Sequence, residues 1–195
     1  MKEVKEDRRV KYTKMALKES FIRLLTQKDI SQITIKEICE NADINRATFY
    51  AHYSDQYDLL RKIENELLDN ISAQLSGYEK AGIAPWESDW HNTVDMVEKI
   101  FDYIRENALL CRLLLNDRGD LHFQKRIMML VYDEIIENLI KKGGITKQEA
   151  EYIYAFAITG CVGAIQKWFD NDLSDSARAM AELLVRAFYK LTMPM

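Results

Sequence analysis

Residues that break helices are scarce in this chain, which contains seven glycines and two prolines among its 195 residues. Apolar side chains recur at three- and four-residue intervals over long stretches, as they do on the buried face of an amphipathic helix. Alternating apolar and polar residues flanked by turn residues, which would indicate β-strands, do not occur. We therefore expect an all-α protein of about nine helices, including one continuous helix over residues 121–142.

Two short helices joined by a tight turn are predicted within residues 34–53. Thr34 is a favourable N-cap residue, and Glu37 three residues later completes the pattern of a capping box. Asn45 follows the turn and is a second N-cap residue. The spacing predicts a helix-turn-helix.

The second of these helices has a surface suited to reading DNA. Phe49 and Tyr53, four residues apart, share its buried face, so the opposite face carries small residues that let the backbone approach base edges. Arginine on that face can pair with guanine, and threonine, tyrosine and histidine can bind phosphates. The amides that open the preceding helix can hold a further phosphate. The predicted DNA-binding residues are Thr34, Lys36, Asn45, Arg46, Ala47, Thr48, Tyr50 and His52. Proteins that do not bind DNA also contain such corners, in which case these residues would form an ordinary solvated face.

Charge divides the chain into a basic N-terminal part and an acidic remainder. Residues 1–62 contain 13 Lys or Arg and 10 Asp or Glu, whereas residues 63–195 contain 14 and 21. The resulting net charges of +3 and −7 fit a polyanion that meets only the N-terminal end, although chance variation of a solvated surface would give the same split. We expect a DNA-binding domain over residues 1–62 and a helical regulatory and dimerisation domain over residues 63–195.

The run TIKEICENADINRATFYAHYSDQYDLL, from Thr34 to Leu60, resembles the DNA-binding domain of the TetR family of bacterial transcriptional regulators. With the preceding helix the resemblance covers roughly residues 8–70, and its TFYxHY core is more specific than a bare helix-turn-helix. It implies a homodimeric repressor that binds a palindromic operator in double-stranded DNA under the control of a small-molecule effector. An activator of the same family and a helical interaction module that does not read DNA are the alternatives.

Two positions depart from the family's pattern. The glycine usual in the turn is Asp43 here, which tolerates a left-handed backbone less easily than glycine does. The lysine that usually opens the fourth helix and touches phosphate is Gln56, which carries no charge. We expect DNA binding to be retained but to depend less on salt, because fewer phosphate ion pairs form.

The last two helices have apolar faces suited to pairing with a second copy of the chain. One of them repeats small residues every four positions, which allows close approach of another helix. The family resemblance implies a four-helix dimer interface from these helices, although both faces would also serve a single intramolecular core. The predicted interface residues are Ala155, Thr159, Gly163, Met180, Leu184 and Phe188.

The middle helices contain methionine, cysteine and aromatic residues that suit an adaptable apolar pocket. Such residues suit an ordinary core as well. Those predicted to line a pocket for a small apolar or aromatic effector are Tyr103, Cys111, Met129, Tyr132, Phe156, Cys161 and Trp168.

Other sequence features argue against several classes of protein. The three cysteines lie far apart in apolar helical patterns, which favours core thiols in a reducing compartment over disulfides. The charged N-terminus lacks the apolar segment of a signal peptide, and the apolar runs are too short to span a bilayer, so we expect a cytoplasmic protein without membrane contact. The three histidines are dispersed, and neither metal-ligand spacing nor a phosphate-binding glycine loop occurs. We expect no metal, no cofactor and no enzymatic activity.

Overall fold

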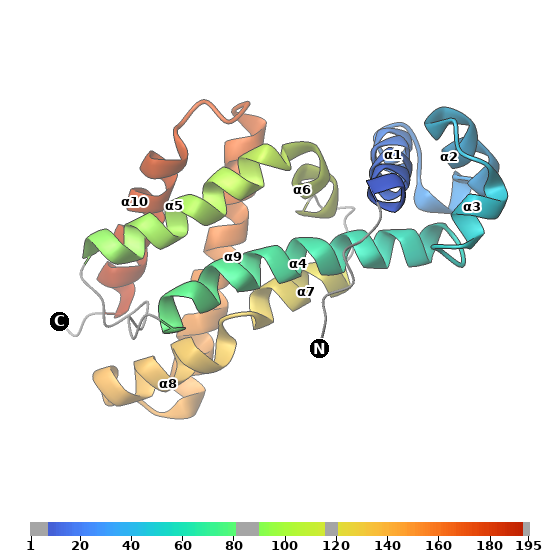
Figure 1. The fold of residues 1–195 in the computed structure, drawn as a ribbon. Coiled ribbons are helices and arrows are strands. Elements are labelled where there is room, and N and C mark those ends of the chain that lie inside the picture. The colour runs from blue at the N-terminus through green and yellow to red at the C-terminus, as the bar shows by residue number, and fades with distance from the viewer. Residues whose placement is uncertain (1–7, 81–89, 116–120, 193–195) are drawn as a thin grey trace. The chain divides into compact units, whose positions relative to one another are not determined.

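A computed structural model describes residues 8–80, 90–115 and 121–192, and within these ranges the chain forms helices and no strands (Figure 1). The prediction of an all-α fold is confirmed. The described α-helices, which accompany one 3-10 turn at Ile30–Gln32, are α1 (Arg8–Leu25), α2 (Ile35–Ala42), α3 (Arg46–Tyr50), α4 (Gln56–Lys80), α5 (Trp90–Glu106), α6 (Ala108–Leu115), α7 (Leu121–Met129), α8 (Tyr132–Gly143), α9 (Lys147–Asp170) and α10 (Ala177–Thr192).

The expected single helix over residues 121–142 is divided into α7 and α8, which corrects the prediction. The two helices are separated at Val131, where φ is −120° and ψ is 10°, outside the α-helical region. The Tyr154 hydroxyl of α9 donates a hydrogen bond to the Met128 carbonyl in the last turn of α7. This partner lies far along the chain, so local apolar periodicity contains no signal for the break.

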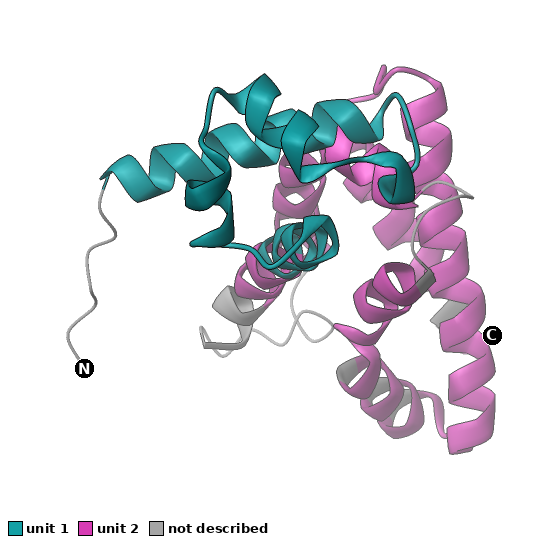
Figure 2. Ribbon diagram, turned by 90° about the vertical axis from the view of Figure 1, so that its right-hand side faces the viewer, with its two compact units in different colours: residues 1–67 teal, residues 68–195 magenta. Residues whose placement is uncertain are grey.

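The chain divides into two compact units within α4, Met1–Leu67 and Leu68–Met195 (Figure 2). The expected functional division after residue 62 also lies within α4, and that division stays a prediction. In the first unit, four helices contribute side chains to one core. Its fully buried members include Leu17 of α1, Phe21 of α1, Ile38 of α2, Phe49 of α3 and Leu59 of α4.

In the second unit, α10 packs against α5 and α9, and α8 packs against α9. Arg178 of α10 is ion-paired with Asp95 of α5, and its Nη1 lies 2.9 Å from Oε2 of Glu98, also on α5. An apolar cluster joins α8 to α9. Its buried members are Ile135, Ile136, Leu139, Ala150 and Tyr154.

Candidate nucleic-acid interface

A capping box between Thr34 and Glu37 opens α2, as the sequence predicts. The Lys28 ammonium group also donates to the Glu37 carboxylate, with Nζ 2.6 Å from Oε1. The Lys28 hydrogen bond, followed by those from the backbone and hydroxyl of Thr34, lowers the pKa of Glu37 to about 2. The carboxylate is therefore ionised at neutral pH and sits in the first turn, where the helix dipole favours negative charge.

The turn from α2 to α3 passes through Asp43, whose φ of 53° and ψ of 42° are left-handed. The Ile44 N–H donates to the Cys39 carbonyl at 2.9 Å, which closes α2. Asn45 then caps α3, because its side-chain oxygen accepts the Ala47 N–H at 2.8 Å. Hydrogen bonds thus define both the end of α2 and the start of α3. These bonds fix the direction of α3 relative to α2.

The buried side of α3 anchors it in the core of the first unit. The rings of Phe49 and Tyr53 have centroids 5.4 Å apart, and both side chains are buried. The opposite side of α3 and its flanks contain the predicted DNA readers. Asn45, Arg46, Ala47 and Tyr50 are exposed, whereas Thr48 and His52 are half-buried. A short helix with a rigid buried side therefore presents small residues, one arginine and one tyrosine.

The predicted contacts at the start of α2 lie beside the start of α3. Thr34 and Lys36 are exposed, and Lys36 lines a shallow hollow together with Asn45 and Arg46. The Lys36 Nζ lies 3.7 Å from Oε1 of Glu40, one turn further along α2. The structure thus gathers the base-reading and phosphate-binding candidates of both helices in one unit.

A group of lysines near His52 was not identified from the sequence. Lys11, Lys14 and Lys18 of α1 line a hollow with His52 and with Lys62 of α4. The three α1 lysines recur at three- and four-residue spacing, so they share one face of the helix. That spacing could have predicted a basic face on α1. It could not have predicted that Lys62 of α4 lies beside this face.

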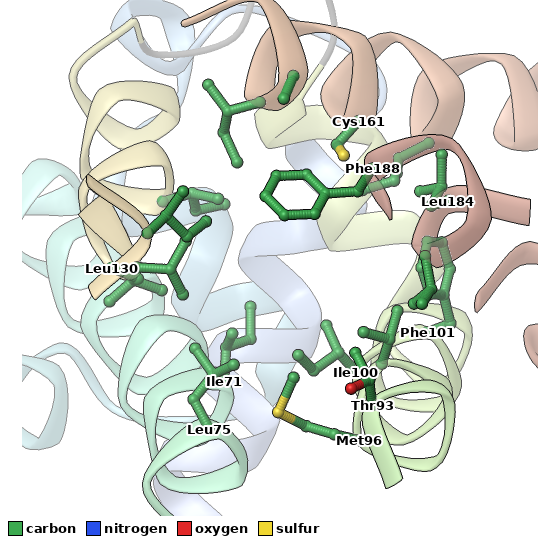
Figure 3. Close-up of a pocket in the computed structure, with 18 of the residues that line it drawn as sticks. Ile71, Leu75, Thr93, Met96, Ile100, Phe101, Leu130, Cys161, Leu184 and Phe188 are labelled. Carbon is green, nitrogen blue, oxygen red and sulfur yellow. The ribbon is translucent and has the colours of Figure 1, made fainter. Parts of the chain in front are cut away.

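The second unit contains an apolar cavity of about 200 Å³ (Figure 3). The cavity is lined by side chains from α4, α5, α9 and α10, such as Leu75, Ile100, Cys161 and Phe188, and by side chains of α7, of α8 and of the segment between them. Among the described residues that line the cavity none is charged, and Thr93 contributes a hydroxyl group. Such a cavity favours an apolar ligand, because a buried charge without a partner is costly.

The residues predicted for a pocket are distributed differently from the expectation. Cys161 lines the cavity, and burial raises the pKa of its thiol. Of the others, Cys111 and Trp168 are buried elsewhere in the core, Tyr103 and Tyr132 are half-buried, and Met129 and Phe156 are exposed. The cavity is instead lined mainly by isoleucine, leucine and valine, since periodicity marks apolar faces but does not show which of them borders a void.

The predicted dimer residues are also divided by the structure. Ala155, Thr159 and Gly163 are exposed on α9, as are Tyr152 and Phe156, each at 68%. In α10, Met180 is buried, and Leu184 and Phe188 line the cavity. These three side chains therefore contribute to the interior of their own unit, and the predicted dimer interface stays a prediction.

Within the part of the chain that the structure describes, no group of three or more His, Cys, Asp and Glu side chains is arranged to hold a metal ion. None of the helices in the described residues combines the length and the hydrophobicity needed to cross a membrane.

Comparisons with protein families match most of the chain. Residues 22–63 match a model described as bacterial regulatory proteins of the tetR family. Residues 91–190 match a model described as the C-terminal region of a transcriptional regulator in the same family group. The two matches cover the helix-turn-helix and nearly all of the helices from α5 to α10.

Individual relatives agree with these matches. A stretch of 83 residues is 37% identical to the uncharacterized HTH-type transcriptional regulator YxbF of Bacillus subtilis (strain 168), and it spans 40% of this chain but 22% of that protein. The TetR transcriptional regulator from Streptococcus agalactiae 2603V has a TM-score of 0.64 at 20% identity, over 94% of this chain and 97% of that one. FadR from Bacillus subtilis, in complex with stearoyl-CoA, has a TM-score of 0.61 at 14% identity, over 89% and 96%. At such identities these structures establish a shared fold.

Proposed function

The chain belongs to the TetR family of bacterial regulatory proteins, and we propose that it is a repressor that binds a palindromic operator as a homodimer and releases it when an effector binds. DNA-binding transcriptional regulation is the family's function. The operator residues, the dimer and the effector are our proposals for this chain.

The exposed side of α3 supports the assignment of the reader residues. Arg46 would pair with guanine, and Ala47 would let the helix approach the base edges. Tyr50 and His52 would contact phosphates on one side of the groove, and Thr34 would do so at the start of α2. The observation that carries the proposal is the burial of Phe49 and Tyr53, since it turns Arg46 and Tyr50 outward.

Fluorescence anisotropy on duplexes obtained by in vitro selection tests this reading. Arg46→Ala should weaken binding to the selected site by about 1–3 kcal/mol and relax base preference, whereas Tyr50→Ala should weaken binding to all duplexes. Arg23→Ala removes an exposed arginine from the same unit, on α1, and serves as the matched control. The regulator reading is excluded if the wild-type protein shows no salt-sensitive DNA binding at micromolar concentration. It is also excluded if both reader variants bind like wild type. Either result would leave the helical interaction module as the remaining alternative.

The exposed face of α9 supports a homodimer. Tyr152 and Phe156 are large apolar side chains one turn apart, and Ala155, Thr159 and Gly163 allow a close approach between helices. Exposed apolar patches of this kind mark interaction sites. A second copy would place two α3 helices about 34 Å apart, in successive major grooves.

Analytical ultracentrifugation tests the dimer. Phe156→Glu should shift the protein from dimer to monomer. Operator binding should weaken as well, because the two DNA-binding units are then no longer joined to bind both half-sites at once. Leu109→Glu changes another exposed apolar residue, on α6, and should leave both properties unchanged. A Phe156→Glu protein that remains dimeric would exclude this face.

The cavity in the second unit supports an apolar effector. FadR from Bacillus subtilis, a fold neighbour, is described with stearoyl-CoA, and an acyl chain fits the uncharged lining found here. Ile71 and Leu75 line the cavity and belong to α4, the helix whose first turns lie in the DNA-binding unit. An effector that binds one position of α4 better than another would shift the populations of the two. Apolar compounds that occupy the cavity should therefore lower the operator affinity of the wild-type protein.

A further inference from the structure

A basic hollow lies beside the apolar cavity in the second unit. It has a volume of about 460 Å³ and is lined by side chains of α4, of α7 and of the turn that follows α7. Leu130, in that turn, lines both the hollow and the cavity, and Figure 3 shows it across the cavity from Leu184. The two spaces are therefore no further apart than the width of a leucine side chain.

The cationic side chains of the hollow come from α7. His122, Lys125 and Arg126 line it, are exposed, and share one face of the helix through their three- and four-residue spacing. Ile127, the residue after Arg126, lines the cavity instead. Helix α7 thus contributes cationic groups to the hollow and an apolar side chain to the neighbouring cavity.

Anion binding in the hollow does not require these cations to lack protein partners. Asp69 of α4 also lines the hollow, and His122 and Arg126 have further interactions within the chain. A guanidinium group has five N–H donors and an ammonium group has three. Arg126 and Lys125 can each keep a protein partner and still donate to an oxyanion, in the strong charge-assisted geometry that carboxylates and phosphates accept.

We propose that the cavity and the hollow together bind an amphipathic anion, with its alkyl chain in the cavity and its carboxylate or phosphate head against Lys125 and Arg126. The inference rests on the proposed function, because it specifies the effector of the same cavity. The chain passes Leu130, whose side chain can turn between staggered rotamers. A flexible chain keeps the charge outside the uncharged lining, whereas a charge attached directly to a ring enters with it.

Isothermal titration calorimetry of the full chain with octanol, octanoate and octyl phosphate tests the joint site, since these probes share a tail and differ in the head. At least one of the anions should bind about tenfold more tightly than octanol, because its head adds charge-assisted hydrogen bonds. The tighter anion identifies carboxylate or phosphate as the preferred head. The advantage over octanol should shrink at high KCl, because salt screens exposed charges.

Three variants separate the head site from the tail site. Lys125→Gln/Arg126→Gln should lose the advantage of the anion and bind octanol as wild type does. Ala157→Phe places a ring at a residue that lines the cavity and should abolish binding of all three probes. Lys141→Gln/Arg186→Gln is the matched control, since it removes the same two residue types from exposed positions outside both linings. Thermal melts establish that all variants fold.

The outcomes distinguish this proposal from the proposed function. Anions that bind no more tightly than octanol, or equally well to Lys125→Gln/Arg126→Gln, would overturn the joint site and leave an apolar effector in the cavity. Anion binding that survives in Ala157→Phe would also overturn it, since the hollow would then hold the head without the tail. If wild type binds none of the probes, the cavity fails as an effector site as well. Anion binding that needs both sites but leaves operator affinity unchanged would support the site and overturn its regulatory role.

Discussion

The Thr34 hydroxyl accepts the backbone N–H of Glu37 at 3.2 Å, while the Glu37 carboxylate accepts the backbone N–H of Thr34 at 2.9 Å. These reciprocal bonds satisfy two amides at the start of α2. Thr146 and Glu149 form the same arrangement at the start of α9, at 3.3 and 2.8 Å. Two equivalent caps therefore occur among the described residues, one of them at the proposed DNA interface.

The two caps allow stability and DNA binding to be separated. Thr34→Ala and Thr146→Ala should each cost about 1 kcal/mol of helix stability, because each loses one capping hydroxyl. Only Thr34→Ala should also weaken operator binding, by about fivefold, which corresponds to about 1 kcal/mol from one phosphate hydrogen bond. Chemical denaturation and anisotropy measure the two effects. Equal DNA affinity of the two variants would remove Thr34 from the interface.

The low pKa of Glu37 predicts a specific dependence of stability on pH. Its pKa falls from an ordinary value of 4.5 to about 2 in the folded chain, chiefly through Lys28. A lowered pKa stabilises the fold fully above pH 4.5, and the contribution is lost as the pH falls through the range between 4.5 and about 2. Glu37→Gln should therefore have a lower melting temperature than wild type at pH 7. The difference between the two melting temperatures should narrow as the pH falls to 3. A gap that is constant with pH would show that the Glu37 charge is not involved, and Lys28→Gln should reproduce the pH-7 loss.

The left-handed backbone at Asp43 predicts that glycine is favourable there. Its φ is 53°, a conformation that costs L-residues roughly 1–2 kcal/mol but is open to glycine. Asp43→Gly should raise the stability of the chain by up to about 1 kcal/mol, and Asp43→Val should lower it by at least as much. Denaturant titration of wild type and the two variants at one pH gives the order of their free energies of unfolding. A glycine variant less stable than wild type would mean that the aspartate side chain stabilises the turn.

The apolar cavity predicts binding of small neutral hydrocarbons. Cavities of similar size lined by aliphatic side chains bind benzene. At a benzene concentration equal to its Kd, binding should raise the free energy of unfolding by about 0.4 kcal/mol, which corresponds to a rise of about 1 °C in the melting temperature. Benzoate should give no shift, because its charge has no partner in the cavity.

Two further readouts locate the benzene site. Ala157→Phe places a ring at a residue that lines the cavity and should abolish the benzene shift. Benzene should also slow alkylation of Cys161, which lines the cavity, but not of Cys39, which lies in the first unit. Burial raises the pKa of both thiols, so Cys39 is a matched reference. An unchanged rate at Cys161 together with a benzene shift in Ala157→Phe would place the ligand elsewhere.

The helix-turn-helix was predictable because its determinants lie within twenty residues of one another. Thr34 and Asn45 are caps whose bonding partners are two or three residues away, and Phe49 and Tyr53 share a face by helical geometry alone. Asp43 was identified as the unusual turn residue from the family's pattern, in which glycine is usual at that position. Scarce helix-breaking residues likewise predicted an all-α fold.

The tertiary structure decided which apolar faces border a void and which basic residues meet. Phe188 was predicted at a dimer interface but lines the cavity, and Phe156 was predicted in the pocket but is exposed. The lysines of α1 join Lys62 only because α1 and α4 fold together around one core. Apolar periodicity and charge count are properties of a single helix, so the sequence by itself determined the helices, their caps and the DNA-reading corner. The neighbours of each helix face depend on packing between segments far apart in the chain, and only the folded structure contains that information.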